Sequence, residues 1–135
     1  MRGLIADHNI AGIVDRVVAT MQNEPFRLFR ESLGIGYFRF EDIGLVPTTP
    51  DSEVWKGCRE LNLLLITDNR NHEGTDSLNA TIQSRSCPDS IPVATIGSVD
   101  RLRTSRAYLE LFIDGLYDTV TNINSLLGTG RIFLP

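Results

Sequence analysis

The segment Leu63–Asn71 constrains the fold of this chain more than any other. It opens with four bulky apolar residues, Leu63–Ile66, and ends abruptly in the polar and charged residues Thr67–Asn71. An unbroken apolar run of this length is typical of a strand covered on both faces, as in a parallel α/β sheet. Side chains placed where such a strand ends point into the crevice in which open α/β sheets bind ligands.

The N-terminal segment repeats this arrangement on a smaller scale. The apolar residues Leu4–Ala6 lead into Asp7, His8 and Asn9. Two strands that each end near an aspartate, here Asp7 and Asp68, can bring two carboxylates to one rim of a sheet. Because carboxylate oxygens suit hard divalent cations, this pair predicts a metal site.

Apolar and amphipathic segments alternate along the rest of the chain. Strands are predicted at 3–6, 37–43, 63–67, 91–96 and 131–134. Helices are predicted over 10–22, 26–33 and 109–127. Another helix is predicted to begin at a cap formed by Asp51 or Ser52, and a further short one to run from a cap at Thr75 or Asp76 to about Gln83. This alternation predicts one domain over 1–135, a three-layer α/β/α sandwich with a mainly parallel sheet of about five strands and right-handed crossovers.

The predicted last helix carries a long apolar stripe at helical spacing. Its members are Leu109, Phe112, Ile113, Leu116, Val120, Ile123 and Leu127. Seven apolar positions exceed what one sheet face needs from a single helix. We therefore expect part of the stripe to serve a homodimer contact.

Size and composition narrow the class of protein. The 135 residues are enough for one domain with a substantial core. No apolar run approaches the ~20 residues needed to cross a bilayer, and the N-terminus lacks the apolar stretch of a secretion signal. Two cysteines without a CxxC spacing indicate neither a zinc site nor a disulfide framework. These features predict a cytoplasmic location and no membrane partner.

The charge of the chain is weakly acidic, with a net charge of −4. That value argues against broad electrostatic attraction to nucleic acid. Among the 13 cationic residues only Lys56 is a lysine. Because the planar guanidinium of arginine suits bidentate contacts with phosphate or carboxylate, a local basic surface is compatible with this composition. The alternative is that the arginines only solvate helix faces.

Three short motifs resemble, in their order and spacing, the small PIN-like proteins of the DUF5615 group. They are Asp7-His8-Asn9 after the first strand, Asp51–Trp55 opening a helix, and Leu65–Asn69 ending the third strand. The resemblance extends over about Leu4 to Gly97. The segments 96–102 and 128–135 resemble an uncharacterised bacterial branch of the same group.

The resemblance implies an acidic pocket at the strand ends and a metal-dependent ribonuclease. In PIN nucleases three or four carboxylates hold Mg²⁺ or Mn²⁺, which activates water for cleavage of phosphodiester bonds. Because many relatives are toxins of toxin–antitoxin pairs, it also implies RNA and an antitoxin-like protein as partners. Carried over to this chain, it implies Asp7, Asp51 and Asp68 as catalytic residues, Asp7 and Asp68 as metal ligands, and Asn9, Asn69, Arg70 and Asn71 as pocket residues.

The chain departs from the family pattern within the third motif. Where the family has "TxDxDF", this chain has Thr67-Asp68-Asn69-Arg70-Asn71-His72. If Thr67 fixes the register, Asn69 and Asn71 replace two acids and Asp68 stands one place early. A neutral amide oxygen lowers the negative charge and weakens metal binding. The alternative function is therefore a catalytically weak or inactive module that binds a partner protein or nucleic acid, and a third is a small-molecule enzyme using the same pocket.

Each candidate residue also has an ordinary structural interpretation. Asp7 can close a turn after a strand, and Asp51 can cap a helix. Arg70 can bind phosphate, or it can pair with Asp68 or Glu73. The loop histidines His8 and His72 are candidate acid–base groups, although loop histidines are more often simply solvated. Glu73 and Asp76 either supply the missing charge or are ordinary loop and cap residues.

Overall fold

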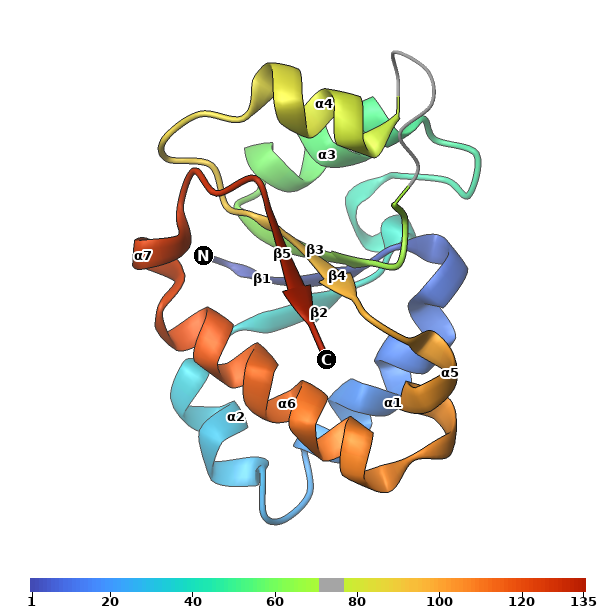
Figure 1. The fold of residues 1–135 in the computed structure, drawn as a ribbon, viewed down its shortest axis with the longest axis vertical. Coiled ribbons are helices and arrows are strands. Elements are labelled where there is room, and N and C mark those ends of the chain that lie inside the picture. Colours follow the sequence, from blue (N-terminus) through green and yellow to red (C-terminus); the bar gives the residue numbers. More distant parts are fainter. Residues whose placement is uncertain (71–76) are drawn as a thin grey trace.

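Five parallel strands form the sheet at the centre of the protein (Figure 1). The computed structural model describes residues 1–70 and 77–135. Across the sheet, the strands are β2 (Gly36–Phe38), β1 (Gly3–Ala6), β3 (Leu63–Thr67), β4 (Val93–Ile96) and β5 (Arg131–Leu134). Every neighbouring pair is parallel, which confirms the predicted α/β class.

Helices cover both faces of this sheet, which gives the three layers seen in Figure 1. One face carries α1 (Ala11–Met21), α2 (Arg27–Leu33), α5 (Val99–Thr104) and α6 (Arg106–Thr121). The other face carries α3 (Asp51–Glu60) and α4 (Leu78–Arg85). The short elements are the 3₁₀ turns η1 (His8–Ile10) and η2 (Phe40–Ile43) and the helix α7 (Ile123–Leu126). Within the described ranges, no helix combines the length and the apolar character that crossing a bilayer requires.

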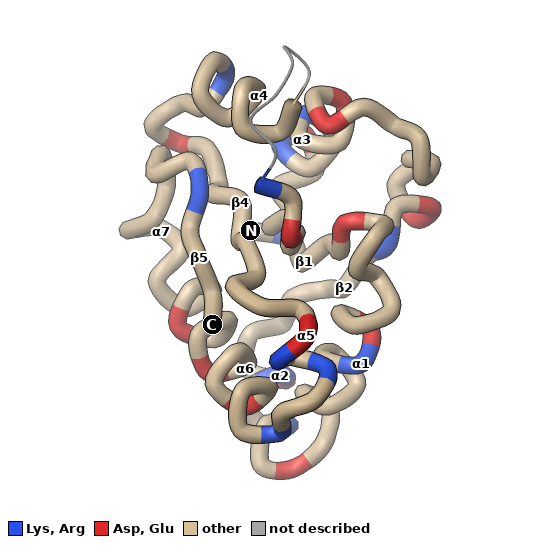
Figure 2. The backbone as a smooth tube through the Cα atoms, turned by 45° about the vertical axis from the view of Figure 1, so that its right-hand side comes forward, with Lys and Arg blue, Asp and Glu red and all other residues tan. Residues whose placement is uncertain are grey.

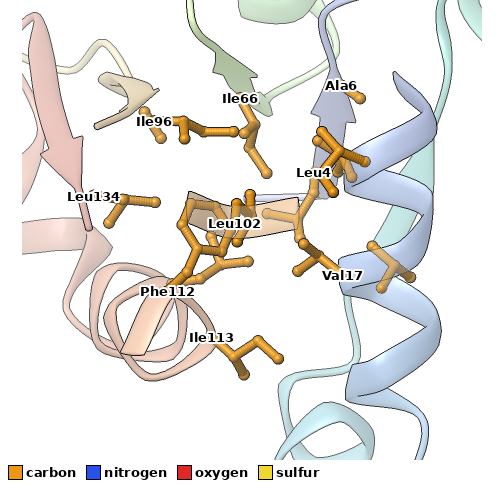
Figure 3. Close-up of a cluster of buried hydrophobic side chains, with 14 of the residues drawn as sticks. Leu4, Ala6, Val17, Ile66, Ile96, Leu102, Phe112, Ile113 and Leu134 are labelled. Atoms are coloured by element: carbon orange, nitrogen blue, oxygen red, sulfur yellow. The ribbon is translucent and has the colours of Figure 1, made fainter. Parts of the chain in front are cut away.

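The larger part of the core lies between the sheet and the helices α1, α5 and α6 (Figure 3). Phe112 and Ile113 of α6 are fully buried there, and Leu116 is 1% exposed. Val120 and Ile123 pack at the edge of the same cluster. Much of the apolar stripe is therefore used inside the chain, and the homodimer stays a prediction.

The second strand, the fourth strand and the last helix end or begin differently from the prediction, and the fourth strand starts at Val93 instead of residue 91. The last helix was expected to run over 109–127, but α6 ends at Thr121 and α7 starts afresh at Ile123, because Asn122 leaves the helical region with φ −105° and ψ 21°. The second strand was expected to reach residue 43, but the chain turns into η2 after Phe38. That turn is stabilised by Asp42, whose Oδ2 accepts a hydrogen bond from the Arg39 backbone N–H at 2.8 Å.

The predicted helix caps are also corrected. Pro50 occupies the N-cap position of α3, and Asp51 is the first residue of the helix, with its carboxylate engaged elsewhere. Ser77 caps α4, since its hydroxyl accepts a hydrogen bond from the Ala80 backbone N–H at 3.2 Å. The predicted caps Thr75 and Asp76 lie outside the described residues.

One connection between strands has the opposite hand to the other three. The chain passes from β3 to β4 over the face of the sheet that α3 and α4 cover. It then passes from β4 to β5 in the same direction across the sheet, but over the opposite face, where α5 and α6 pack beside α1. A parallel crossover rarely departs from the common hand. The prediction of one hand throughout is therefore wrong for this connection, where α6 packs beside α1 instead of beside α4.

Candidate functional site

The candidate site lies where β1 and β3 end side by side. Ala6 is in register with Ile66, and the Asp7 backbone N–H donates to the Ile66 carbonyl at 2.9 Å. The chain leaves β1 toward one edge of the sheet and leaves β3 toward the other. Such a reversal of direction opens the crevice in which doubly wound sheets bind their ligands. The strands β1 and β3 are therefore neighbours, and Asp7 and Asn69 follow them at the same edge of the sheet.

The carboxylate of Asp7 is held by the end of β3. Its Oδ2 accepts a hydrogen bond from the Thr67 hydroxyl at 2.6 Å, and the same hydroxyl oxygen accepts one from the Asn69 backbone N–H at 2.9 Å. Burial raises the pKa of Asp7 above its usual value, with further contributions from the charges of Asp51 and Asp68; the hydrogen bonds from Thr67 and the Asn9 backbone oppose the rise. The ionised carboxylate is thus oriented but poorly solvated.

Asp51 brings a second carboxylate to the same place. It lies at the start of α3, and its Oδ2 accepts hydrogen bonds from the Asn69 side-chain amide at 2.9 Å and from the Leu78 backbone N–H at 3.1 Å. A residue expected to cap its own helix instead joins the start of α3 to the end of β3 and the start of α4. Asn69 is consequently linked to both carboxylates, to Asp7 through Thr67 and to Asp51 directly.

These groups line a small cavity of about 70 Å³. Its polar lining residues are Asp7, His8, Asn9, Thr49, Asp51 and Asn69, and its apolar ones are Phe40, Pro47, Val54, Leu65 and Leu78. No lysine or arginine is among the described residues that line it. The described lining of this cavity therefore includes two carboxylates and neither a lysine nor an arginine.

A larger and more open cavity of about 500 Å³ lies beside the first. Asn9 lines both cavities, whereas Asp68, Arg70, Asp100 and Arg103 line only the larger one. Residues of both charge signs gather at this end of the sheet (Figure 2). Asp68, predicted to pair with Asp7 as a metal ligand, is exposed on this second cavity, and the carboxylate that shares a cavity with Asp7 is Asp51.

Arg70 is held by neutral groups. Its Nη2 donates to the carbonyls of Ile96 at 3.0 Å and Gly97 at 3.1 Å, and its guanidinium lies 5.6 Å from the centre of the Phe133 ring. The alternative in which Arg70 pairs with Asp68 is not seen among the ion pairs of the described residues. Glu73, the other predicted partner, lies outside the described residues, as do Asn71 and His72.

Arg131 was not predicted to contribute to the site. From β5 its Nη1 donates to the Asn69 carbonyl at 2.8 Å and to the Thr95 hydroxyl at 2.6 Å. Burial, together with the charge of Arg70, lowers the pKa of Arg131. Its Nη2 is buried without a hydrogen-bond partner in the described part of the chain. The one feature of the sequence that could have indicated this role is the position of Arg131 as the first residue of an otherwise apolar strand.

Two carboxylates, those of Asp7 and Asp51, line the small cavity. Among residues 1–70 and 77–135, no three His, Cys, Asp or Glu side chains are placed to hold one ion. Asp7 and Asp51 supply two carboxylates, and Mg²⁺ commonly keeps several waters while it is bound through one or two carboxylates. In the described ranges these two carboxylates, without a third acidic ligand placed beside them, are what the cavity offers to a divalent ion.

No protein-family model, curated protein or solved structure matches this chain. The fold and the site define a class, a doubly wound α/β domain with paired carboxylates in a cavity at its switch point. Fold alone does not imply an activity, so a function has to be argued from the site itself.

Proposed function

We propose that the protein is a Mg²⁺- or Mn²⁺-dependent ribonuclease of the PIN-like type. The observation that carries the proposal is that Asp7 and Asp51 share one small cavity whose described lining contains no lysine or arginine. Two carboxylates in a partly desolvated cavity repel each other, and a divalent cation relieves that repulsion.

The side chains around the cavity would hold such an ion and leave the chemistry to bound water. A divalent ion lowers the pKa of its water and stabilises the charge that develops on a phosphodiester. The Thr67 hydroxyl and the Asn69 amide fix the orientations of the Asp7 and Asp51 carboxylates. Outer partners of this kind contribute measurably to metal affinity, because they hold the ligands in place.

The larger cavity supplies groups that suit an RNA backbone. Arg70 and Arg103 line it, and guanidinium groups bind phosphate through paired N–H donors. Asn9 borders both cavities, so a phosphodiester beside it would lie between the carboxylates and the two arginines. RNA as the substrate class follows from the resemblance to PIN-like proteins.

Cleavage of a mixed single-stranded RNA pool with Mn²⁺ tests this proposal. Asp7→Asn and Asp51→Asn should each lower the rate by at least about tenfold, the size expected for losing a group that stabilises the transition state. Asp118→Asn, on the exposed surface of α6, is the matched control and should cleave like the wild type. Equal rates for all four proteins would reject the two aspartates as catalytic.

A binding module is the second candidate, and one observation favours it. Asp51 Oδ2 already accepts two hydrogen bonds, and the described residues offer two carboxylates where an efficient nuclease site has three or four. Under this alternative the wild type binds RNA but does not cleave it at millimolar Mn²⁺. Arg70→Gln and Arg103→Gln should then weaken RNA binding and flatten its salt dependence, whereas Arg27→Gln, on α2, should not.

A further inference from the structure

A separate cavity of about 150 Å³ opens at the opposite end of the sheet. It lies between the second half of α3 and the starts of β3 and β4. Its apolar walls include Trp55, Cys58, Leu63, Ile91 and Val93. An apolar protein cavity of similar volume is known to take up benzene. The space thus matches a ligand body about the size of one aromatic ring.

One cationic side chain lines this cavity. The guanidinium of Arg59 lies 5.7 Å from the centre of the Trp55 ring, and its Nη1 donates to the Ser90 hydroxyl. Its Nη2 is 3.4 Å from Asp89 Oδ1, and the Asp89 side chain is 80% exposed. An ion pair this exposed contributes little, so Asp89 is a weak competitor for the guanidinium.

The remaining walls carry no charge that would oppose an anion. Burial raises the pKa of the Cys58 thiol to about 12, so the thiol stays neutral at physiological pH. Asn62 and Ser90, which also line the cavity, are neutral. Arg59 and Asp89 are therefore the only charged side chains of the described lining, which combines apolar residues with a few polar ones.

We propose that this cavity binds a small molecule that has a compact apolar body, about the size of a benzene ring, and one carboxylate. The body lies against Trp55 and Val93, and the carboxylate takes the place of Asp89 beside Arg59. Small-molecule sites commonly have such a lining, mostly apolar with a few polar groups that fix the orientation of the ligand.

The cavity is distinct from the paired-carboxylate site. Leu65 contacts both spaces and stands between them, while Asp7 and Asp51 line only the other one. Ligand binding here therefore does not depend on the proposed nuclease function.

Benzoate is a suitable probe, because Trp55 is the only tryptophan and lines the cavity. Titration with benzoate should give a saturable change in tryptophan fluorescence. Benzamide, which has the same ring but no charge, should bind about tenfold more weakly, as expected for losing a charge-assisted hydrogen bond. The absence of a saturable change, or equal affinity for the two compounds, would overturn the proposal.

Two substitutions should move the benzoate affinity in opposite directions. Arg59→Gln should weaken binding about tenfold, because the guanidinium is lost. Asp89→Asn should strengthen binding severalfold, because it removes the competing carboxylate and leaves the exposed turn intact. Arg85→Gln, in the last turn of α4, is the control and should have no effect. Weaker benzoate binding by Asp89→Asn would contradict the proposal even if Arg59→Gln failed to fold.

Discussion

The Thr67 hydroxyl donates a hydrogen bond to Asp7 Oδ2 at 2.6 Å and thereby joins the end of β3 to the end of β1. The same oxygen accepts a hydrogen bond from the Asn69 backbone N–H. Thr67 is fully buried, so water cannot replace either contact. The Thr67 hydroxyl thus holds the Asp7 carboxylate and the Asn69 backbone in position at the acidic cavity.

Replacing this hydroxyl with a methyl group should destabilise the protein. Thr67→Val removes the hydrogen bonds that the hydroxyl makes with the Asp7 carboxylate and with the Asn69 N–H, which should lower the free energy of unfolding by ~1–3 kcal/mol. Urea denaturation at neutral pH measures the change. Thr119→Val is the matched control, because the Thr119 hydroxyl only donates to the Gly115 carbonyl within α6, and it should change stability by less than ~1 kcal/mol. Equal losses for the two variants would contradict this account.

The pH dependence of stability should reveal the buried carboxyl of Asp7. Burial raises the pKa of Asp7 in the folded protein above the ordinary value of 3.8. The protonated carboxyl therefore stabilises the fold fully below pH 3.8, and this stabilisation is lost as the pH rises through the pKa of the folded state. Asp7→Asn should therefore be more stable than the wild type at neutral pH in a chelator, and this advantage should vanish below about pH 3.8. Urea midpoints of both proteins across this pH range check the sign. An advantage that grew on acidification would reverse the interpretation.

Introducing an acid at residue 69 should lower the stability of the protein and raise its affinity for metal. In Asn69→Asp, a carboxylate replaces the amide that donates to Asp51 at 2.9 Å, so two like charges face each other. We expect the metal-free protein to lose ~1–3 kcal/mol and the affinity for Mn²⁺ to rise by about tenfold. Calorimetric titration and denaturation measure the two effects. Asn122→Asp, beyond α6, should produce neither, and a lower Mn²⁺ affinity in Asn69→Asp would argue against a metal site at Asp51.

Two leucines of α6 provide a test of the core. Leu116 is 1% exposed, whereas Leu111 of the same helix is 57% exposed. Leu116→Ala should lower the free energy of unfolding by ~2–5 kcal/mol, and Leu111→Ala should change it by less than ~1 kcal/mol. Denaturant unfolding gives both values. A large loss for Leu111→Ala would show that this exposed position is covered in solution, as the predicted homodimer would allow.

The parts of the fold that were predicted correctly depend on local composition. The strand Leu63–Thr67 has the bounds that its apolar run indicated, and β5 starts at Arg131 as expected. All five residues of β3 are buried, as an unbroken apolar run indicates, whereas β5 is a partly exposed edge strand that is marked by its short apolar run after Gly130. The position of Asp7 beside the end of β3 followed because parallel strands end at the same edge of a sheet.

The parts that were missed depend on contacts between distant segments. The sequence alone could not show whether Asp51 caps its own helix or contacts other segments. Its contacts with Asn69 and Leu78 arise only when α4 packs beside α3. Arg131 reaches Asn69 only because β5 pairs with β4 in one particular register. Asn122 interrupts the apolar stripe without changing its spacing, so periodicity alone predicted one continuous helix.

The uncommon hand of the connection from β4 to β5 has a consequence for the order of folding. Strand twist favours the other hand, so local geometry does not guide β5 to its place. The helix α6 contacts β5 and buries Leu109 and Phe112 against α1 and the sheet, so it limits where β5 can lie beside β4. We expect β5 to join after α6 has docked, so substitutions at its core residue Leu134 should accelerate unfolding and leave the folding rate nearly unchanged.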